Sequence, residues 1–361
     1  MIVRNESQVI KRCFDSVLPL ISYWVIVDTG SSDGTQEIIR NYFKEKGIPG
    51  ELHERPWIDF ATDRNFALEL GRGKADYLMF LDADEILLYH PGFKPHDIEE
   101  NFYFILAETG GSAFVRPFLM KSTFDARWEG VVHETLVFKA PVQPAIYANV
   151  SLVSYPDGAR TRSGKKFHND VVMLKKAYKN DPTNGRLLFY LARSHLANRQ
   201  LKKAAYYFKK IVKVASFSEE AYMAQMDLGR TYLLQEKPIG TIVRAFEQAS
   251  KIAPNRQEPN YLIAHLYRTH KNYEKAFEWA EKGIQKPEGE ANIYLEKWVY
   301  QHGMRLEYML AAYATGHKEE GKKAAEAILT RKDITQNVRN LIDRTLRALE
   351  RGDLSPLTTV K

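Results

Sequence analysis

Residues 25–35 read Val25-Ile26-Val27-Asp28-Thr29-Gly30-Ser31-Ser32-Asp33-Gly34-Thr35. An apolar, β-branched run ends at an acidic residue, and small polar residues then lead into a helical pattern that continues through Phe43. Ligands of open α/β sheets bind beyond the carboxyl ends of the strands, which is where Asp28 would lie. This stretch therefore predicts a strand, a ligand-binding loop and a helix, with Asp33 suited to cap the helix.

The same alternation runs through the sequence up to about residue 155. Short apolar runs lie at residues 2–3, 24–27, 51–57 and 77–81, and helical patterns separate them. Such alternation is typical of a doubly wound, mostly parallel sheet, with residues 77–81 as its fourth strand. A β-rich pattern from Ala113 to about Tyr155 predicts antiparallel additions to this α/β domain.

Beyond residue 160 the pattern is helical and repetitive. Leu191-Ala192, Leu228-Gly229 and Ile263-Ala264 begin similar segments that lie 37 and 35 residues apart. This spacing is close to the period of about 34 residues of tetratricopeptide repeats, which stack because a single helix pair cannot bury its apolar face. We predict an α/β domain over 1–155, a linker over 156–170 and an all-α solenoid over 171–361.

A second motif, Phe80-Leu81-Asp82-Ala83-Asp84-Glu85, places three acids at the end of an apolar run. Their mutual repulsion indicates that a positive group lies beside them. Carboxylate oxygens are ligands that Mg²⁺ and Mn²⁺ prefer, and such an ion can bridge a diphosphate and offset its charge as a leaving group. The motif therefore predicts a divalent-metal site beside the loop that follows Val27.

Two other enzyme classes share fragments of these motifs, and the sequence argues against both. Aspartic proteases also use Asp-Thr-Gly-Ser, but they need two carboxylates that share a proton, and this tetrad occurs here once. A homodimer could supply the second copy, yet such proteases are all-β whereas the flanking pattern is α/β. A dinucleotide-binding domain is excluded because no G-x-G-x-x-G follows the first strand.

The composition of the chain bears on its expected location in the cell. The chain has 361 residues with one cysteine, and neither a signal-peptide pattern nor an apolar run of about 18 residues occurs. We therefore expect a cytoplasmic protein without a transmembrane segment. The net charge of +7 is expected to come from lysines on solvated helical faces, and no specific nucleic-acid partner is predicted.

Together these motifs resemble the inverting glycosyltransferases of family two, which have the GT-A fold. The resemblance extends to the β-rich region and to the first helical repeat, so that it covers most of the chain. It is carried by Met1-Ile2-Val3-Arg4-Asn5-Glu6, Ile10, Cys13, Ser16-Val17, residues 26–35, Asp63-Arg64-Asn65-Phe66-Ala67-Leu68, Leu81-Asp82-Ala83-Asp84-Glu85, residues 128–134 and residues 189–194.

The resemblance implies the donor-binding half of a site. Asp28 would hold the nucleobase of a nucleoside-diphosphate sugar, and the segment with Val3, Asn5 and Glu6 would line the same pocket. Arg64 would lie beside the diphosphate, because the paired donors of a guanidinium suit phosphate oxygens.

The remaining roles concern the metal and the proton. By the same resemblance Asp82 would face the ribose and the metal ion, Mn²⁺ or Mg²⁺, and Asp84 would ligate that ion. Inversion needs a carboxylate that takes the acceptor's proton, for which Glu134 is the candidate base. His133 beside it is the candidate third metal ligand, since imidazole is compatible with Mn²⁺.

The expected activity is therefore metal-dependent transfer of a hexosyl group, with inversion, from a nucleotide sugar to a protein or glycan acceptor. A uridine diphosphate (UDP) sugar is the first choice of donor. The concave face of the repeats would hold a macromolecular acceptor or a second copy of the chain. The alternative is a scaffold that acts through its repeats, which the short first strand favours because the family usually has several more apolar residues there.

Overall fold

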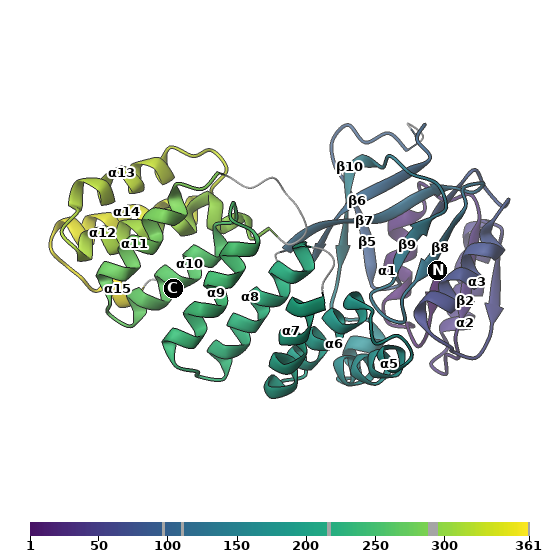
Figure 1. The fold of residues 1–361 in the computed structure, drawn as a ribbon. Helices are drawn as coiled ribbons and strands as arrows, with labels where there is room; N and C mark the ends of the chain where they lie inside the picture. The colour runs from purple at the N-terminus through teal and green to yellow at the C-terminus, as the bar shows by residue number, and fades with distance from the viewer. Residues whose placement is uncertain (96–97, 110–111, 215–217, 288–294, 360–361) are drawn as a thin grey trace. The chain divides into compact units, whose positions relative to one another are not determined.

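The computed structural model describes residues 1–95, 98–109, 112–214, 218–287 and 295–359. The chain forms two compact units, Met1–Asn180 and Asp181–Lys361 (Figure 1). The second unit begins later than the predicted solenoid. The expected linker, 156–170, lies within the first unit, where it contains helix α4 (Ala159–Arg162) and the start of α5 (Lys166–Asn180).

The first unit contains a three-stranded parallel sheet of order β1-β2-β3, made of β1 (Ile2–Val3), β2 (Trp24–Asp28) and β3 (Gly50–Glu54). Helices α1 (Ile10–Val17), α2 (Thr35–Lys46) and α3 (Phe60–Gly71) follow the three strands in turn. β3 begins with glycine because it pairs with Trp24, whose ring would lie 2.3 Å from a Cβ at Gly50. The strand, loop and helix predicted around Asp28 are present.

A second sheet has five strands in the order β4-β7-β6-β10-β5. These are β4 (Tyr77–Met79), β5 (Glu85–Tyr89), β6 (Phe102–Thr109), β7 (Ser112–Lys121) and β10 (Ala145–Ser154). Strand β4 was expected to be the fourth strand of the parallel sheet, and this expectation was wrong. β4 pairs antiparallel with β7, with Met79 opposite Leu119, whereas β1 is only two residues long and offers almost no edge for it.

Two further strands, β8 (Ala126–Glu129) and β9 (Thr135–Phe138), form a small antiparallel hairpin. The predicted antiparallel additions are thus present, in part as this hairpin and in part as the β6–β7 pair. Residues 130–134, which include two of the predicted site residues, connect β8 to β9 and therefore lie in a tight connection between two strands.

Helix α1 packs between the two sheets and joins their cores. On one side Ile10 and Phe14 contact the parallel sheet and α2, in a cluster with Ile26 and Phe43. On the other side Cys13 and Val17 belong to a cluster built on the five-stranded sheet. Because both faces of α1 are covered, Ile10 and Cys13 are fully buried. α1 therefore fixes the loop that precedes it and the strand ends on both sides.

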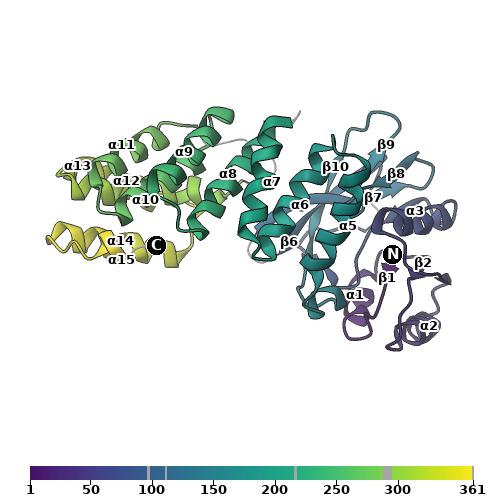
Figure 2. The same ribbon diagram turned by 60° about the horizontal axis from the view of Figure 1, so that its bottom comes forward.

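The second unit consists of helices that pack in consecutive pairs (Figure 2). The first helices of three of the four pairs carry the predicted repeat positions, at the buried residues Leu191, Leu228 and Ile263. The pairs are α6 (Gly185–Ala197) with α7 (Leu201–Val214), α8 (Ser218–Leu234) with α9 (Ile239–Ile252), α10 (Glu258–Thr269) with α11 (Tyr273–Ile284), and α12 (Met304–Ala314) with α13 (Lys318–Leu329).

Small residues recur in these first helices because the second helix of the pair lies close. A Cβ at Gly229 of α8 would lie 2.4 Å from the ring of Phe246 on α9. The unit is completed by a π-helical turn, η1 (Val299–Gly303), and by α14 (Gln336–Glu350) and α15 (Pro356–Thr359). None of the helices in the described part of the chain combines the length and apolar character that crossing a bilayer requires.

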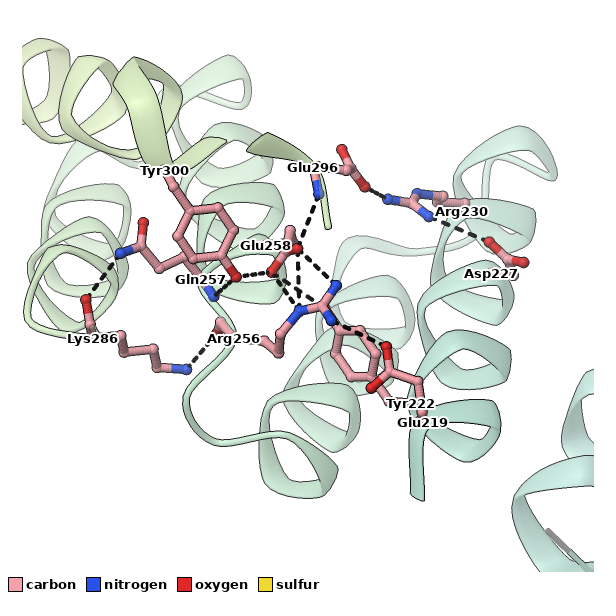
Figure 3. A network of polar contacts seen from close by, with 10 residues as sticks. All are labelled: Glu219, Tyr222, Asp227, Arg230, Arg256, Gln257, Glu258, Lys286, Glu296 and Tyr300. Atoms are coloured by element: carbon pink, nitrogen blue, oxygen red, sulfur yellow. Dashed lines mark hydrogen bonds and ion pairs between the residues drawn. The ribbon is translucent and has the colours of Figure 1, made fainter. Parts of the chain in front are cut away.

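A buried polar network connects α8, the start of α10 and η1 (Figure 3). The guanidinium of Arg256 donates to both oxygens of Glu258 and, at 3.1 Å, to Glu219. The carboxylate of Glu258 also accepts from the hydroxyl of Tyr300 at 2.6 Å. Arg256 and Glu258 are both buried, so this charge pair is stable because many hydrogen bonds saturate it.

We expect Glu258→Gln to lower the free energy of unfolding of the helical unit by roughly 3 kcal/mol, because Arg256 loses its buried charge partner although it retains the ion pair with Glu219. Thermal and urea unfolding of the whole chain would measure the loss. Glu278→Gln, at an exposed position on α11, removes the same charge and should leave the transition in place. Equal unfolding midpoints for the two variants would show that the network contributes little to stability.

Candidate active site

The loop after β2 is organised by Asp28. Its side chain is 1% exposed, and Oδ1 accepts hydrogen bonds from the backbone of Gly30 at 2.9 Å and of Ser31 at 2.7 Å. Gly30 has a φ of 103°, a left-handed conformation that glycine adopts without strain. The second oxygen, Oδ2, is buried and has no hydrogen-bond partner among the described residues. Asp28 thus shapes the loop with one oxygen and leaves the other for a further donor.

The segment that follows β1 lies against this loop. Val3 is buried and pairs with Asp28 across the two strands. Asn5, at a φ of 58°, accepts from the backbone of Ser32 at 2.8 Å and donates its own N–H to Ser31 Oγ at 2.8 Å. Burial raises the pKa of the neighbouring Glu6 to about 7. The structure therefore brings Val3, Asn5 and Glu6 beside the loop of Asp28.

The acids after β4 have three different environments. Asp82 accepts from Arg64 at 2.7 Å, and although burial opposes ionisation, Arg64 and Arg116 lower its pKa. Burial, followed by the charge of Asp82, raises the pKa of Asp84. Glu85 is buried and ion-paired with Arg116, and it also accepts from the backbone of Asp82 at 2.8 Å. Glu85 therefore supports the loop, whereas the negative charge of Asp84 is opposed by burial and by Asp82 and is only partly offset by Lys166.

Arg64, on α3, connects two of the predicted site carboxylates. Its Nη2 donates to Asp82 at 2.7 Å and its Nε to Glu134 at 2.5 Å, and its guanidinium lies 5.3 Å from the centre of the Trp128 ring. The side chains of Arg64 and Glu134 are only 11% and 12% exposed. Residues distant in sequence therefore meet at one point of the first unit.

His133 is placed differently from its neighbour. It has a φ of 53° and is exposed, whereas Glu134 points inward to Arg64. Within the described ranges, no three histidine, cysteine, aspartate or glutamate side chains group closely enough to hold a metal ion. Asp82, Asp84 and His133 are thus not grouped as a metal site among the described residues.

The pair of carboxylates at Asp82 and Asp84 remains a fit for a divalent ion. Mg²⁺ is commonly held by one or two carboxylates together with substrate phosphates, rather than by a complete set of protein ligands. Burial and then Asp82 raise the pKa of Asp84, with Lys166 acting in the opposite direction, and a bound divalent ion would favour the charged form of both carboxylates.

Asp82, Asp84 and the segment from Ile2 to Glu6 border a cavity of about 620 Å³ in the first unit, whereas Asp28, His133 and Glu134 are not among the described residues that line it. One wall is formed by residues 2–6 and 82–84, with Arg64. The other wall was missed by the sequence interpretation, because it comes from the expected linker and from α5; its residues include Gly158, Ala159, Arg160, Lys166 and Asn169. A Cβ at Gly158 would lie 2.5 Å from Asp84 Oδ2, so glycine permits this close approach. The Pro156-Asp157-Gly158 turn was the available signal, but it resembles any loop.

Comparison with known proteins finds a family match in the N-terminal part of the chain. Residues 1–91 match the family described as Glycosyl transferase family 2. The glycosyltransferase SunS of Bacillus subtilis (strain 168) is 23% identical over 240 residues, which are 62% of this chain and 54% of SunS. The lipopolysaccharide core biosynthesis glycosyltransferase LpsC of Rhizobium meliloti (strain 1021) is 34% identical over 87 residues, 24% of this chain and 31% of LpsC.

Other relatives are named for their repeats. A TPR repeat-containing protein of Synechococcus elongatus is 37% identical over 89 residues, 24% of this chain and 20% of that protein. Among solved structures, MamA has a TM-score of 0.37 at 20% identity and covers 47% of this chain and 91% of its own. YrrB, a TPR protein, has a TM-score of 0.36 at 11% identity, covering 51% and 87%. The chain spans between a fifth and about half of the length of the curated relatives named here.

Proposed function

We propose that this chain, which carries a family 2 glycosyltransferase domain followed by tetratricopeptide-type repeats, transfers a sugar from a nucleoside-diphosphate donor with inversion. A UDP sugar is the proposed donor, a protein or glycan the proposed acceptor and the cytoplasm the proposed location. The observation that carries the proposal is the cavity of about 620 Å³, which is bordered by the Asn5–Glu6 segment, by Asp82 and Asp84, and by Arg64.

Donor binding would begin at Asp28. Its buried Oδ2 has no partner among the described residues, and an N–H of a nucleobase would supply the missing hydrogen bond. Leaving a buried acceptor unpaired costs about 1–3 kcal/mol, so this contact should discriminate between bases. The neighbouring segment at Asn5 and Glu6 would line the base and ribose pocket.

Asp82 and Asp84 would hold Mn²⁺ or Mg²⁺ together with the diphosphate. When bound, such an ion would neutralise the charge that develops on the departing diphosphate. Arg64 keeps Asp82 ionised and orients it, since its guanidinium contacts both Asp82 and Glu134. The guanidinium of Arg64 would therefore hold Asp82, which binds the donor, and Glu134, which accepts the proton, in a fixed arrangement.

Glu134 would accept the proton of the acceptor hydroxyl as that oxygen attacks the anomeric carbon. Its Oε1 contacts Arg64 Nε at 2.5 Å, so the hydroxyl would approach Oε2. Glu134 lies in the connection between β8 and β9, and the pairing of these two strands restrains the backbone on both sides of it. Positioned general bases of this kind contribute about 10²–10⁴-fold to such steps.

A thermal-shift panel of nucleoside diphosphates, with and without Mn²⁺, tests this proposal. A ligand that binds the folded state alone raises the unfolding temperature by mass action, so UDP with Mn²⁺ is expected to give the largest shift. Release of free sugar from the matching donor would follow from the same site. If no nucleoside diphosphate changes the unfolding temperature and no donor is hydrolysed, the proposed activity is wrong.

Asp28→Asn is expected to weaken UDP binding about tenfold while the first unit stays folded. The amide keeps an oxygen for Gly30 and Ser31, but its NH₂ would meet the N–H of the base, donor against donor. Calorimetric titration of UDP would measure the change. Glu37→Gln, at an exposed position of α2, serves as the matched control, and unchanged affinity in Asp28→Asn would reduce Asp28 to a loop residue.

The alternative is a scaffold that acts through its helical repeats and has little catalytic activity. Two observations favour it: the third metal ligand at His133 is not assembled, and Asp82 is already ion-paired with Arg64. Nucleotide binding without donor hydrolysis in Mn²⁺ would support the scaffold. In either case we propose that the helical unit holds a macromolecular acceptor or a second copy of the chain, and light scattering over a range of concentrations would detect self-association.

A further inference from the structure

We propose that Arg160 and Lys166, in the segment that leads from β10 to α5, bind the diphosphate of the donor. The inference rests on the proposed function and adds the phosphate-binding residues of the same cavity. Both side chains line that cavity, and they come from the segment that the sequence predicted to be a linker. They therefore supply positive charge to the cavity that Asp82 and Asp84 also line.

This segment is fixed to the acidic wall of the cavity. The backbone N–H of Tyr155 donates to the carbonyl of Asp84 at 3.1 Å, and that of Ala159 donates to the carboxylate of Glu6 at 3.0 Å and 3.1 Å. Arg162 adds a hydrogen bond from Nη2 to the carbonyl of Asn5 at 3.1 Å. These contacts bind the segment to both loops of the site, so the side chains it carries face a defined place.

Arg160 is held in position from two sides. Its guanidinium forms an ion pair with Asp170, a carboxylate on α5 that is 1% exposed. The guanidinium also lies 4.6 Å from the centre of the Phe60 ring, and Phe60 lines the same cavity. A buried acid and an aromatic ring therefore orient this side chain at the cavity wall, which restricts its rotamers before any ligand arrives.

Lys166 lies at the first residue of α5 and is half-buried. Burial, and then the charge of Arg160, lower the pKa of Lys166, whereas Asp84 and Asp82 act in the opposite direction. Lys166 thus lies near the guanidinium of Arg160, whose charge Asp170 partly offsets, and a bound anion would offset the repulsion that remains. The preceding Lys165 is exposed and is not among the residues that line the cavity.

The distribution of charge favours a diphosphate over a simple carboxylate ligand. A guanidinium offers paired donors to phosphate oxygens and an ammonium adds a compact charge. With Arg4 and Arg64, these two cations outnumber the carboxylates of Glu6, Asp82 and Asp84 among the described residues that line the cavity. An anionic group of the acceptor could bind to the same two side chains. Competition between UDP and pyrophosphate distinguishes this group from the diphosphate of the donor.

The experiment uses Arg160→Gln and Lys166→Gln in the full chain, with Lys165→Gln as the matched control. Calorimetric titration with inorganic pyrophosphate, UDP and uridine in the presence of Mn²⁺ reports phosphate binding separately from base binding. We expect each variant to bind pyrophosphate and UDP about tenfold more weakly, the scale of one lost charge-assisted contact. Uridine affinity, and every affinity of Lys165→Gln, should equal that of the parent. Arg160→Lys should recover part of the loss, because it restores the charge without the paired donors.

Arg160→Gln leaves Asp170 buried without its partner, so its unfolding temperature without ligand is measured first. If Arg160→Gln fails to fold, it is replaced by the double variant Arg160→Gln/Asp170→Asn. Lys166→Gln is measured as a separate variant in either case. Parental affinity for pyrophosphate and UDP in Lys166→Gln and in the folded Arg160 variant would overturn the inference, even if the parent transfers sugar. The inference would also be wrong if UDP did not compete with pyrophosphate for binding. Arg160 and Lys166 would then bind an anionic group of the acceptor. A parent that binds no nucleoside diphosphate would instead remove the proposed function.

Discussion

Replacing Asp84 by asparagine is expected to lower sugar transfer by at least about 100-fold, the scale seen when one group that stabilises developing charge is removed. The carboxylate that would hold the divalent ion against the diphosphate is lost, while size and shape are kept. The first unit should remain folded, because burial and the charge of Asp82 already oppose ionisation of Asp84 and raise its pKa. Transfer rates measured across a range of Mn²⁺ concentrations, with UDP affinity in parallel, would report the loss.

Asp125→Asn is the matched control for this variant. Asp125 is paired with Lys139 at 3.1 Å on the surface, where its side chain is 66% exposed, so the change should leave transfer and Mn²⁺ dependence unaltered. If Asp84→Asn transfers sugar at near the parental rate with the same Mn²⁺ dependence, Asp84 does not hold the ion and the metal proposal falls.

Glu134→Gln is expected to keep UDP affinity close to that of the parent and to reduce transfer by about 10²–10⁴-fold. The amide preserves the volume of the side chain and can accept from Arg64 through its oxygen, but it cannot take a proton. Single-turnover transfer with the donor pre-bound would isolate this step from donor binding. The loss should appear with every acceptor, because the proton comes from whichever hydroxyl attacks.

The control for the second variant is Glu129→Gln, at the end of β8 in the same hairpin. Glu129 is paired with Arg127 and is 44% exposed. Glu129→Gln therefore removes a negative charge from the same hairpin and leaves the contacts of Arg64 unchanged. A rate for Glu134→Gln within a few-fold of the parent would assign the base to another residue, and the hairpin would then serve only to position Arg64.

The parts of the fold that could be predicted are those in which local sequence determines the outcome. The run from Trp24 to Asp28, the turn at Gly30 and the helix from Thr35 are neighbours in sequence, and each carries its own signal. The choice of partner for β4 is not local, because it depends on residues some 40 positions later in β7. Apolar character identified that strand, but it contains no information about which edge the strand would occupy.

The candidate site divides in the same way. Asp28, Asp82 and Asp84 could be proposed because each follows an apolar strand directly. Arg160 and Lys166 had no such signal, since they follow a turn in a basic stretch that also fits a solvent-exposed linker. Their positions depend on contacts with Glu6 and Asp84, which lie some 150 and 75 residues earlier. The separate directions of His133 and Glu134 depend on one backbone torsion angle, which residue types alone do not specify.

Cys13 gives the chain a built-in reporter of local opening. It is the single cysteine of the sequence, it is fully buried on α1, and its Sγ donates to the carbonyl of Asp82 at 3.4 Å. Burial raises the pKa of this thiol, and a buried neutral thiol reacts slowly with alkylating reagents. The rate of Cys13 labelling should therefore report how often α1 separates from the Asp82 loop. Unfolding of the helical unit should not contribute to the signal, because that unit has no cysteine. A ligand that binds beside Asp82 should slow that labelling in proportion to its occupancy.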